Sequence, residues 1–278
     1  HANIVQAAAF SPDGAILATA SGDKTVKLWA LSSKRFLCGL TGHSNWVRTA
    51  VFNPDGRQVA SGSDDKTVRV WDLETRKTVG TYYDHSANVN AVRYHPDGTC
   101  VAACSDDMSV KLWDPRSNQL LQHYPAHDGP VTDLSFHSTG NYLLSSSVDK
   151  TLKMWDLREG RLLYTLHGHH HPVAACGFGP KGRYFASAGG DDVVMVWKTN
   201  FDSSSVRRKA VAIDVPQKGP SGGRAPLPAT RVVASGVTPE NADRYADVDC
   251  FMVATGINKD DSFYDISPAR LAALMQVT

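Results

Sequence analysis

Hydrophobic and polar positions recur along the first 202 residues in one pattern, which is clearest between His43 and Asp72. Apolar and polar side chains alternate over residues 47–52, as they do in a β-strand with two different faces. A Pro-Asp-Gly turn follows at residues 54–56, where the glycine tolerates a positive φ. Three more strands are expected near residues 59–61, 67–71 and 79–82. The pattern therefore predicts an antiparallel sheet of four short strands.

This unit returns every 42 residues, so three kinds of residue form columns through the chain. The columns contain the tryptophans Trp29, Trp71, Trp113, Trp155 and Trp197, the histidines His1, His43, His85, His127 and His169, and the aspartates Asp23, Asp65, Asp107, Asp149 and Asp191. A period of about 40 to 45 residues with these anchors is typical of a four-stranded propeller blade. A sheet that is apolar on both faces cannot bury both alone and must stack on neighbours around an axis. The sequence predicts an all-β propeller with five blades in residues 1–202.

Each repeat also places a histidine, a hydroxyl residue, an aspartate and a tryptophan inside this apolar stack. An unpaired buried polar group costs about 1 to 3 kcal/mol, so these groups need one another as partners. At these positions the chain resembles the WD40 repeat family, which implies a hydrogen-bond network that ties a turn to the sheet. The network residues are predicted to be His43, Ser61, Asp65, Trp71, His127, Ser145, Asp149, Trp155, His169, Ser187, Asp191 and Trp197. The third blade has Ala103 at the hydroxyl position, so we expect its network to be incomplete.

The two ends of the chain depart from the repeat. The sequence starts at His1, inside a repeat, and the WD40 family most often closes its ring with seven blades, so we expect further blades upstream. At the other end, the fifth repeat lacks the apolar residues of a fourth strand. We expect a linker over residues 203–228, in which residues 211–215 alternate well enough to supply that outer strand. Residues 229–278 are predicted to be a tail of little regular structure, with a short helix near 268–276.

The amino-acid composition of the chain limits the classes of molecule that it is expected to bind. Hydrophobic residues make up 42% of the chain and charged residues 21%, as in ordinary globular proteins. The net charge of +1 gives no support to nucleic-acid binding, and no apolar run reaches the ~18 residues of a membrane span. Five cysteines without paired spacing favour reduced thiols in the cytoplasm over disulfides or zinc. We expect no nucleic acid, membrane, small-molecule substrate or cofactor.

The repeated histidine, serine and aspartate are also the residue types of a catalytic triad. They occur at the same spacing in nearly every blade, whereas a catalytic site needs one copy, so we predict no catalytic residue and no enzyme. Residues 167–171 contain four histidines, but His169 belongs to the structural column, and unsupported loop histidines are poor metal ligands. No metal site is predicted.

Recognition is expected where the repeats differ. Trp46 and Arg48 lie where the first strand of a blade emerges near the axis, and the other repeats carry different residues there. Exposed tryptophan and arginine are favoured anchors of protein interfaces. The protein-binding rim is predicted to include Trp46, Arg48, Asp64, Asn88, Asn90 and Asp106. The alternative is that Trp46 packs between blades and Arg48 is only solvated. Basic residues on the opposite face form either a patch for an acidic protein or a solvated loop face.

Residues 194–202, VMVWKTNFD, and the repeats before them resemble the last five blades of the centriolar WD40 proteins, the "proteome of the centriole" family. The resemblance covers about residues 1–202. It implies a cytoskeletal protein of centrioles and basal bodies that binds tubulin or centriolar wall proteins and supports centriole assembly, stability and ciliogenesis. That family usually ends in a short coiled-coil segment, whereas the tail here has no sustained heptads, so localisation through such a segment has no support in this chain.

A second function is consistent with the same fold. Other WD40 adaptors, in ubiquitin-ligase or chromatin complexes, read a short peptide along the propeller axis. Peptide binding that depends on Asp64 or Asp106 would favour this alternative. An enzyme would require a polar constellation that occurs once, and the sequence contains none.

Overall fold

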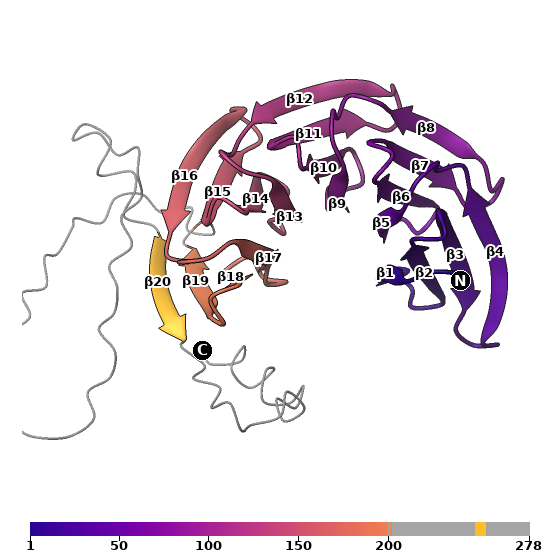
Figure 1. The fold of residues 1–278 in the computed structure, drawn as a ribbon, viewed down its shortest axis with the longest axis horizontal. Helices are drawn as coiled ribbons and strands as arrows, with labels where there is room; N and C mark the ends of the chain where they lie inside the picture. Colours follow the sequence, from indigo (N-terminus) through magenta and orange to yellow (C-terminus); the bar gives the residue numbers. More distant parts are fainter. Residues whose placement is uncertain (200, 202–247, 254–278) are drawn as a thin grey trace, which may run out of the picture.

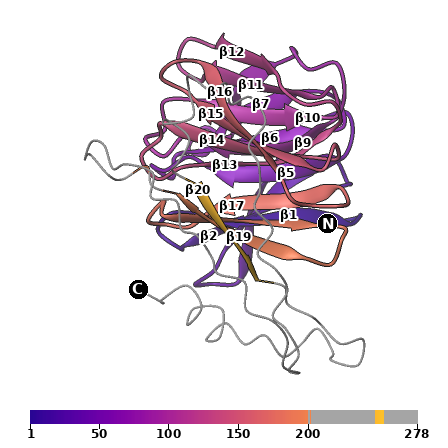
Figure 2. The same cartoon turned by 90° about the vertical axis from the view of Figure 1, so that its left-hand side faces the viewer.

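The structure is a computed structural model that describes residues 1–199, 201 and 248–253. Its strands form five four-stranded antiparallel sheets, which we number blades 1 to 5 in chain order (Figure 1). The all-β, five-bladed architecture predicted from the 42-residue repeat is therefore confirmed. In the turned view of Figure 2 the strands run across the molecule and the loops gather at its two ends.

Strands follow one another from the axis to the perimeter in every blade. The innermost strands are β1 (Val5–Phe10), β5 (Val47–Phe52), β9 (Val89–Tyr94), β13 (Val131–Phe136) and β17 (Val173–Phe178). The second strands are β2 (Ile16–Ser21), β6 (Gln58–Ser63), β10 (Val101–Ser105), β14 (Tyr142–Ser147) and β18 (Tyr184–Gly189). The third strands are β3 (Thr25–Ala30), β7 (Val68–Asp72), β11 (Ser109–Asp114), β15 (Thr151–Asp156) and β19 (Val194–Thr199). The outer strands are β4 (Arg35–Thr41), β8 (Thr78–Tyr82), β12 (Gln119–Pro125), β16 (Arg161–His167) and β20 (Val248–Val253).

The core lies between the blades rather than inside any one of them. Each of four hydrophobic clusters combines side chains of two consecutive blades, so that Val26 of blade 1, for example, shares a cluster with Val59 and Trp71 of blade 2. The column tryptophans of blades 2 to 5 are almost fully buried in these clusters. Stacking around an axis therefore buries both faces of each inner sheet, as the apolar pattern requires.

The five blades form an open arc in which the flanks of blades 1 and 5 have no neighbouring blade among the described residues (Figure 1). Phe10 of blade 1 is 67% exposed, whereas Phe52 at the same position in blade 2 is 9% exposed. Trp29 is likewise only half-buried. The exposed flank of blade 1 thus consists of the same columns that bury the blade contacts elsewhere.

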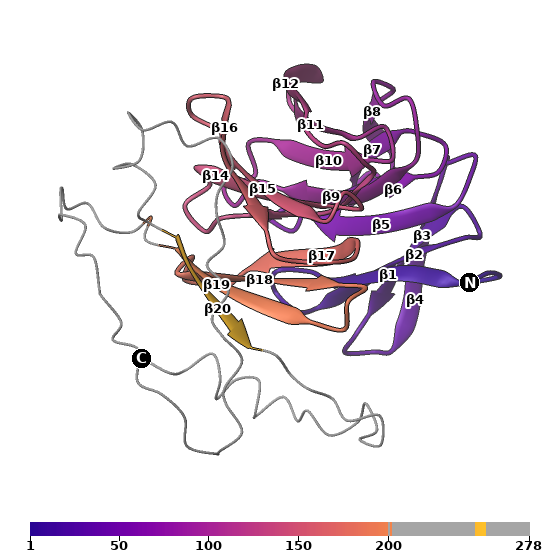
Figure 3. The same ribbon diagram turned by 60° about the vertical axis from the view of Figure 1, so that its left-hand side comes forward.

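The outer strand of blade 5 comes from a distant segment. β20 pairs antiparallel with β19, and Figures 1 and 3 both show the two strands side by side. The strand β20 lies in the region after residue 229, for which the sequence predicted little regular structure and no particular strand. Residues 211–215, which the sequence offered for this position, lie outside the described residues, as do the expected linker at 203–228 and the expected helix near 268–276. Among the described residues, no helix has the length and apolar character needed to cross a bilayer.

Candidate functional site: the histidine rim and the axial cavity

Loops at the two ends of the arc form two rims with different chemistry. The histidine rim contains the loops that carry His43 and its equivalents, together with the hairpins that carry Asp65 and its equivalents. The glycine rim contains the turns of Gly56 and its equivalents and the turns that lead into the outer strands. Gly56 has a φ of 73°, so the sequence-predicted turn adopts the left-handed conformation that glycine favours.

A hydrogen-bond network of four side chains, from a histidine, a hydroxyl residue, an aspartate and a tryptophan, links the histidine rim to the sheet. In blade 2, Nδ1 of His43 donates to Oδ2 of Asp65 at 2.8 Å, because a carboxylate can only accept. Nε2 then accepts from the hydroxyl of Ser61 at 2.8 Å, and the indole of Trp71 donates to the same oxygen at 2.8 Å. The same three contacts occur in the first, fourth and fifth blades, with Thr19 as the hydroxyl residue in the first. These side chains therefore hold the loop before β5 and the hairpin after β6 in fixed positions.

The electrostatics of the network suit a structural role. Burial by itself would raise the pKa of the Asp65 carboxyl, but hydrogen bonds from His43 and Thr67 outweigh burial, and the pKa lies well below its usual range. The equivalent Asp107 and Asp149 are shifted in the same direction for the same reasons. A carboxylate that stays ionised and fully bonded cannot act as a proton donor near neutral pH. The repeated triad-like residues thus serve to fix the loops.

The hydrogen-bond network of blade 3 differs from that of the other blades. Ala103 supplies no hydroxyl, and the buried Nε2 of His85 has no hydrogen-bond partner among the described residues. The indole of Trp113 instead donates to Oδ2 of Asp84 at 2.7 Å. Asp84 occupies the position of Gly42 and Gly168 in other repeats. The sequence predicted the incomplete network in this blade but missed its partial replacement by Asp84.

Because Asp84 takes over the bond that a hydroxyl at position 103 would make, substitutions of Asp84 and Ala103 should have coupled effects on stability. Asp84→Gly should lower the free energy of unfolding by about 1 to 3 kcal/mol, because it leaves the buried indole N–H of Trp113 unpaired. Ala103→Ser should restore the hydroxyl, bond both His85 and Trp113, and remove most of the cost of Asp84→Gly. Urea titration of the two single variants and the double variant measures the coupling. Additive effects would contradict the assignment of Asp84 as the substitute partner.

A β-bulge occurs at the second residue of each inner strand, and in blades 2 to 4 the bulged residue lines a cavity along the axis. The register between the first two strands shifts at this residue in all five blades. Arg48 is the bulged residue of blade 2, and its side chain is 40% exposed. Its guanidinium donates to the Asp64 carboxylate, and the backbone N–H of Asp64 donates to the backbone oxygen of Trp46 at 2.9 Å. A bulge re-aims a side chain and bends the strand, so this position suits a residue that contacts a ligand.

The structure brings the six predicted rim residues together in two adjacent blades. Trp46 is 39% exposed, so the alternative in which it is buried between blades is not what the structure shows. In blade 3, Asn90 donates to Asp106 at 2.7 Å and to the backbone oxygen of Val131 in blade 4 at 2.8 Å. The backbone oxygen of Asn88 accepts from the N–H of Asp106 at 3.0 Å. Asp64 and Asp106 are therefore bonded within their own blades rather than free to receive a basic peptide.

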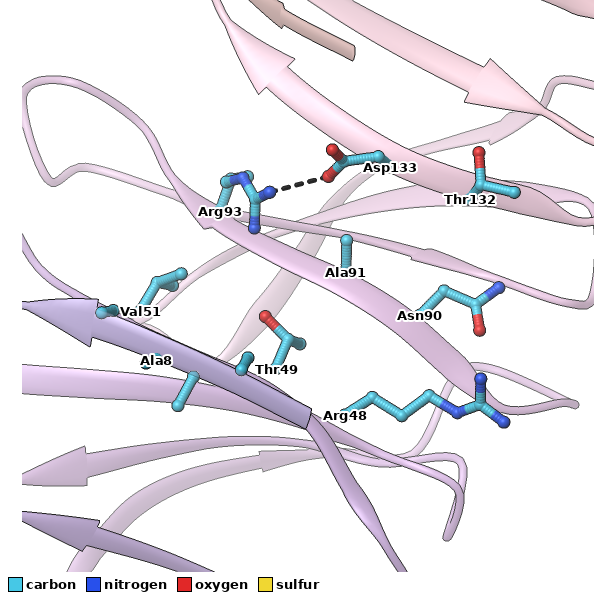
Figure 4. A pocket seen from close by; sticks show the side chains of 12 residues that line it. Ala8, Arg48, Thr49, Val51, Asn90, Ala91, Arg93, Thr132 and Asp133 are labelled. Atoms are coloured by element: carbon cyan, nitrogen blue, oxygen red, sulfur yellow. Dashed lines mark hydrogen bonds and ion pairs between the residues drawn. The ribbon is translucent and has the colours of Figure 1, made fainter. Parts of the chain in front are cut away.

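A cavity of about 420 Å³ opens beneath these residues along the axis. Figure 4 shows Arg48 and Asn90 at one end of it and an ion pair between Arg93 and Asp133 at the other, with small side chains such as Ala91 between them. Arg93 of blade 3 reaches Asp133 of blade 4 at 2.7 Å. Sequence reasoning missed Arg93 and Asp133, although each is the one charged residue in a column of otherwise uncharged residues on the inner strands. The cavity offers charged and amide groups at its ends and mainly small side chains between them.

Side chains on the glycine rim tie successive blades together. Nε2 of His95 lies 2.9 Å from the backbone oxygen of Gly140, and Nε2 of His137 lies 3.1 Å from that of Gly182. Each contact joins one blade to the next. Sequence reasoning missed these histidines, although both stand immediately before a turn that ends in glycine.

No group of three or more histidine, cysteine, aspartate or glutamate side chains suited to a metal ion occurs in the part of the chain that the structure describes. His169, from the histidine-rich run, is bonded to Asp191 and Ser187. Burial raises the pKa of the Cys100 thiol to about 12, so this cysteine is not a reactive thiolate.

Fold and rims together define a class of protein: a β-propeller whose fixed sheets carry variable loops. The chain belongs to the WD40 family, since the family model for the WD domain, G-beta repeat, matches residues 1–30, 34–72, 76–114, 118–156 and 160–198. A comparison with curated proteins finds no match. WD40 repeats imply a protein-interaction scaffold or adaptor, and their fold is typically a module without catalytic activity.

Proposed function

We propose that this chain is a non-enzymatic scaffold of centrioles and basal bodies that binds tubulin or a neighbouring wall protein through the histidine rim of blade 2. The observation that carries the proposal is the exposed Trp46 in the loop just before β5, two residues from the half-exposed Arg48, which is the bulged residue of β5 and lines the axial cavity. Aromatic and arginine side chains presented on a rigid sheet lose little conformational freedom on binding and serve as interface anchors.

The centriolar assignment is supported by the resemblance of the repeats and of residues 194–202 to the centriolar WD40 family. A scaffold of this kind would support centriole assembly, stability and ciliogenesis in the cytoskeleton. The competing function, peptide reading by a ubiquitin-ligase or chromatin adaptor, is less well supported, because Asp64 and Asp106 already accept hydrogen bonds from Arg48 and Asn90.

Blade 3 supplies a test that preserves the fold. Replacing Trp46 by Asn and Arg48 by Asn gives blade 2 the residues of blade 3, where Asn90 bonds Asp106 at 2.7 Å, so Asp64 should keep a partner. We expect the double variant to lose most of its binding to isolated centrioles, by about tenfold or more if the pair is a hot spot. Co-sedimentation with purified centrioles measures the effect, and the urea midpoint should stay unchanged.

The matched control is Arg57→Asn, which removes an exposed arginine from the glycine rim of the same blade. It should bind like the unmodified protein. Undiminished binding of the Trp46 and Arg48 variant would dismiss this rim as the interface, and failure of the unmodified protein to bind centrioles would dismiss the centriolar assignment.

A further inference from the structure

The outer strands of blades 1 and 2 and the residues just before them present exposed apolar and basic side chains at the glycine rim, away from the residues just described. We name these residues the outer strip. It consists of Lys34 just before β4, of the first three residues of β4, which are Arg35, Phe36 and Leu37, and of Arg76 and Lys77 just before β8. Figure 1 shows β4 and β8 following one another along the outside of the arc.

The apolar part of the strip is exposed by its position in the blade and not by the open flank of blade 1. Phe36 is 53% exposed and Leu37 is 42% exposed. The equivalents of Phe36 in blades 3 and 4, Leu120 and Leu162, remain 42% and 39% exposed although a blade precedes each of them. The Phe36 ring meets Trp29 edge-on at 5.5 Å, which holds it in place on the surface. A fixed, exposed aromatic ring is suited to docking.

The basic part of the strip is not neutralised. Within the described residues, Lys34, Arg35, Arg76 and Lys77 form no ion pair. In blade 4 the corresponding turn does neutralise its charges, because Arg158 lies 3.4 Å from Asp156 and Arg161 lies 2.5 Å from Glu159. The strip therefore carries four cations without an ion-pair partner among the described residues, whereas blade 4 pairs both arginines of its turn.

Two of these cations occupy strained backbone positions. Lys34 has a φ of 53° and Arg76 a φ of 57°, in the left-handed region. Blades 3 and 4 place Asn118 and Gly160 at this position, and both residue types adopt the conformation easily. A cation kept where glycine would fit better suggests a role for the charge beyond folding.

From the equivalent contact between blades 2 and 3, we infer that the strip continues across the boundary between blades 1 and 2. In blade 3, Asn118 accepts a hydrogen bond of 3.2 Å from the hydroxyl of Tyr82, which lies on the preceding outer strand, β8. By the repeat, Arg76 takes the same place beside β4. Both β4 and β8 are the last strands of their sheets, so their outer edges can receive an extended chain.

We propose that the outer strip docks an extended acidic segment of a partner protein. Apolar side chains of the segment cover Phe36 and Leu37, and its carboxylates meet the four cations. An anionic membrane is the less favoured occupant, because the apolar side chains lie within a strand and not on a loop that could insert into lipid. The outer strip is separate from the histidine rim, so the experiment on one surface can support or overturn its proposal whatever the outcome at the other.

Glycine substitution removes the charges while relieving the backbone strain. We expect Lys34→Gly with Arg76→Gly to weaken binding of a labelled peptide of alternating glutamate and leucine about tenfold, from the loss of two exposed charge pairs. The matched control is Lys24→Gly with Lys66→Gly, which removes two cations with φ of 69° and 70° from the histidine rim of the same blades. Fluorescence anisotropy with the full chain measures both, and urea midpoints should not fall in either variant.

Loss of peptide binding in the first variant alone, together with weaker binding at higher salt, supports the proposal. Equal losses in both variants would show an effect of net charge only and overturn it. No binding of the peptide, or binding to phosphatidylserine vesicles without binding of the peptide, would also overturn it. Release from centrioles by the Trp46 and Arg48 variant has no bearing on this outcome.

Discussion

Replacing His43 by Ala should lower the free energy of unfolding by about 3 kcal/mol, whereas replacing His85 by Ala should lower it by only about 1 kcal/mol. His43 makes one bond to the ionised Asp65 and one to Ser61, each of 2.8 Å. A hydrogen bond to a charged group contributes about 1.5 to 3 kcal/mol, and one between neutral groups about 1 kcal/mol. Both contributions vanish in His43→Ala.

His85 makes the bond of 2.8 Å to Asp107 but leaves its second ring nitrogen buried and unpaired. His85→Ala thus loses one bond and also removes an unsatisfied polar atom, which offsets part of the loss. Urea titrations of the two variants under the same conditions measure the difference. Equal losses would contradict the prediction, and so would a larger loss in blade 3. A second check is Ala103→Ser, which should make His85→Ala as costly as His43→Ala.

Periodic features of this protein could be predicted from the sequence because they recur from repeat to repeat. The strands and the turn glycine recur in all five copies and the full polar network in four of them, so the columns identify these features without any tertiary information. The rim residues were identified in the opposite way, as departures from the columns. The structure places Arg48 on a bulge of β5 and Trp46 in the loop just before that strand, and both side chains are exposed enough to contact a partner; whether they bind one stays a prediction.

Features that depend on contacts between columns were missed. Asp84 replaces a glycine in the same repeat in which Ala103 replaces a hydroxyl, and only the fold shows that both side chains meet Trp113. Two departures in one repeat are a signal that sequence reasoning could have used. Val248–Val253 gave no such signal, because a strand supplied from outside the repeat has no column to compare with.

Gly182→Ala should lower the free energy of unfolding by about 3 kcal/mol, while Gly14→Ala at the equivalent position should cost about 1 kcal/mol. Both glycines adopt left-handed backbone, with φ of 70° and 69°, so an alanine is strained equally at each. A Cβ on Gly182 would lie 2.1 Å from Nε2 of His137, a fully buried side chain, whereas a Cβ on Gly14 would meet nothing within 4 Å. The added loss at Gly182 combines overpacking with the broken bond from His137 to the backbone oxygen.

The cause of that difference can be isolated, because blade 1 has Ser11 where blade 4 has His137. His137→Ser removes the imidazole that the new methyl group would strike, so Gly182→Ala in that background should cost about as little as Gly14→Ala. Urea titration of the two single variants and the double variant gives the coupling. If Gly182→Ala remained as costly without the imidazole, backbone strain alone would explain it, and the contact from His137 to Gly182 would not be what couples blades 4 and 5 at the glycine rim.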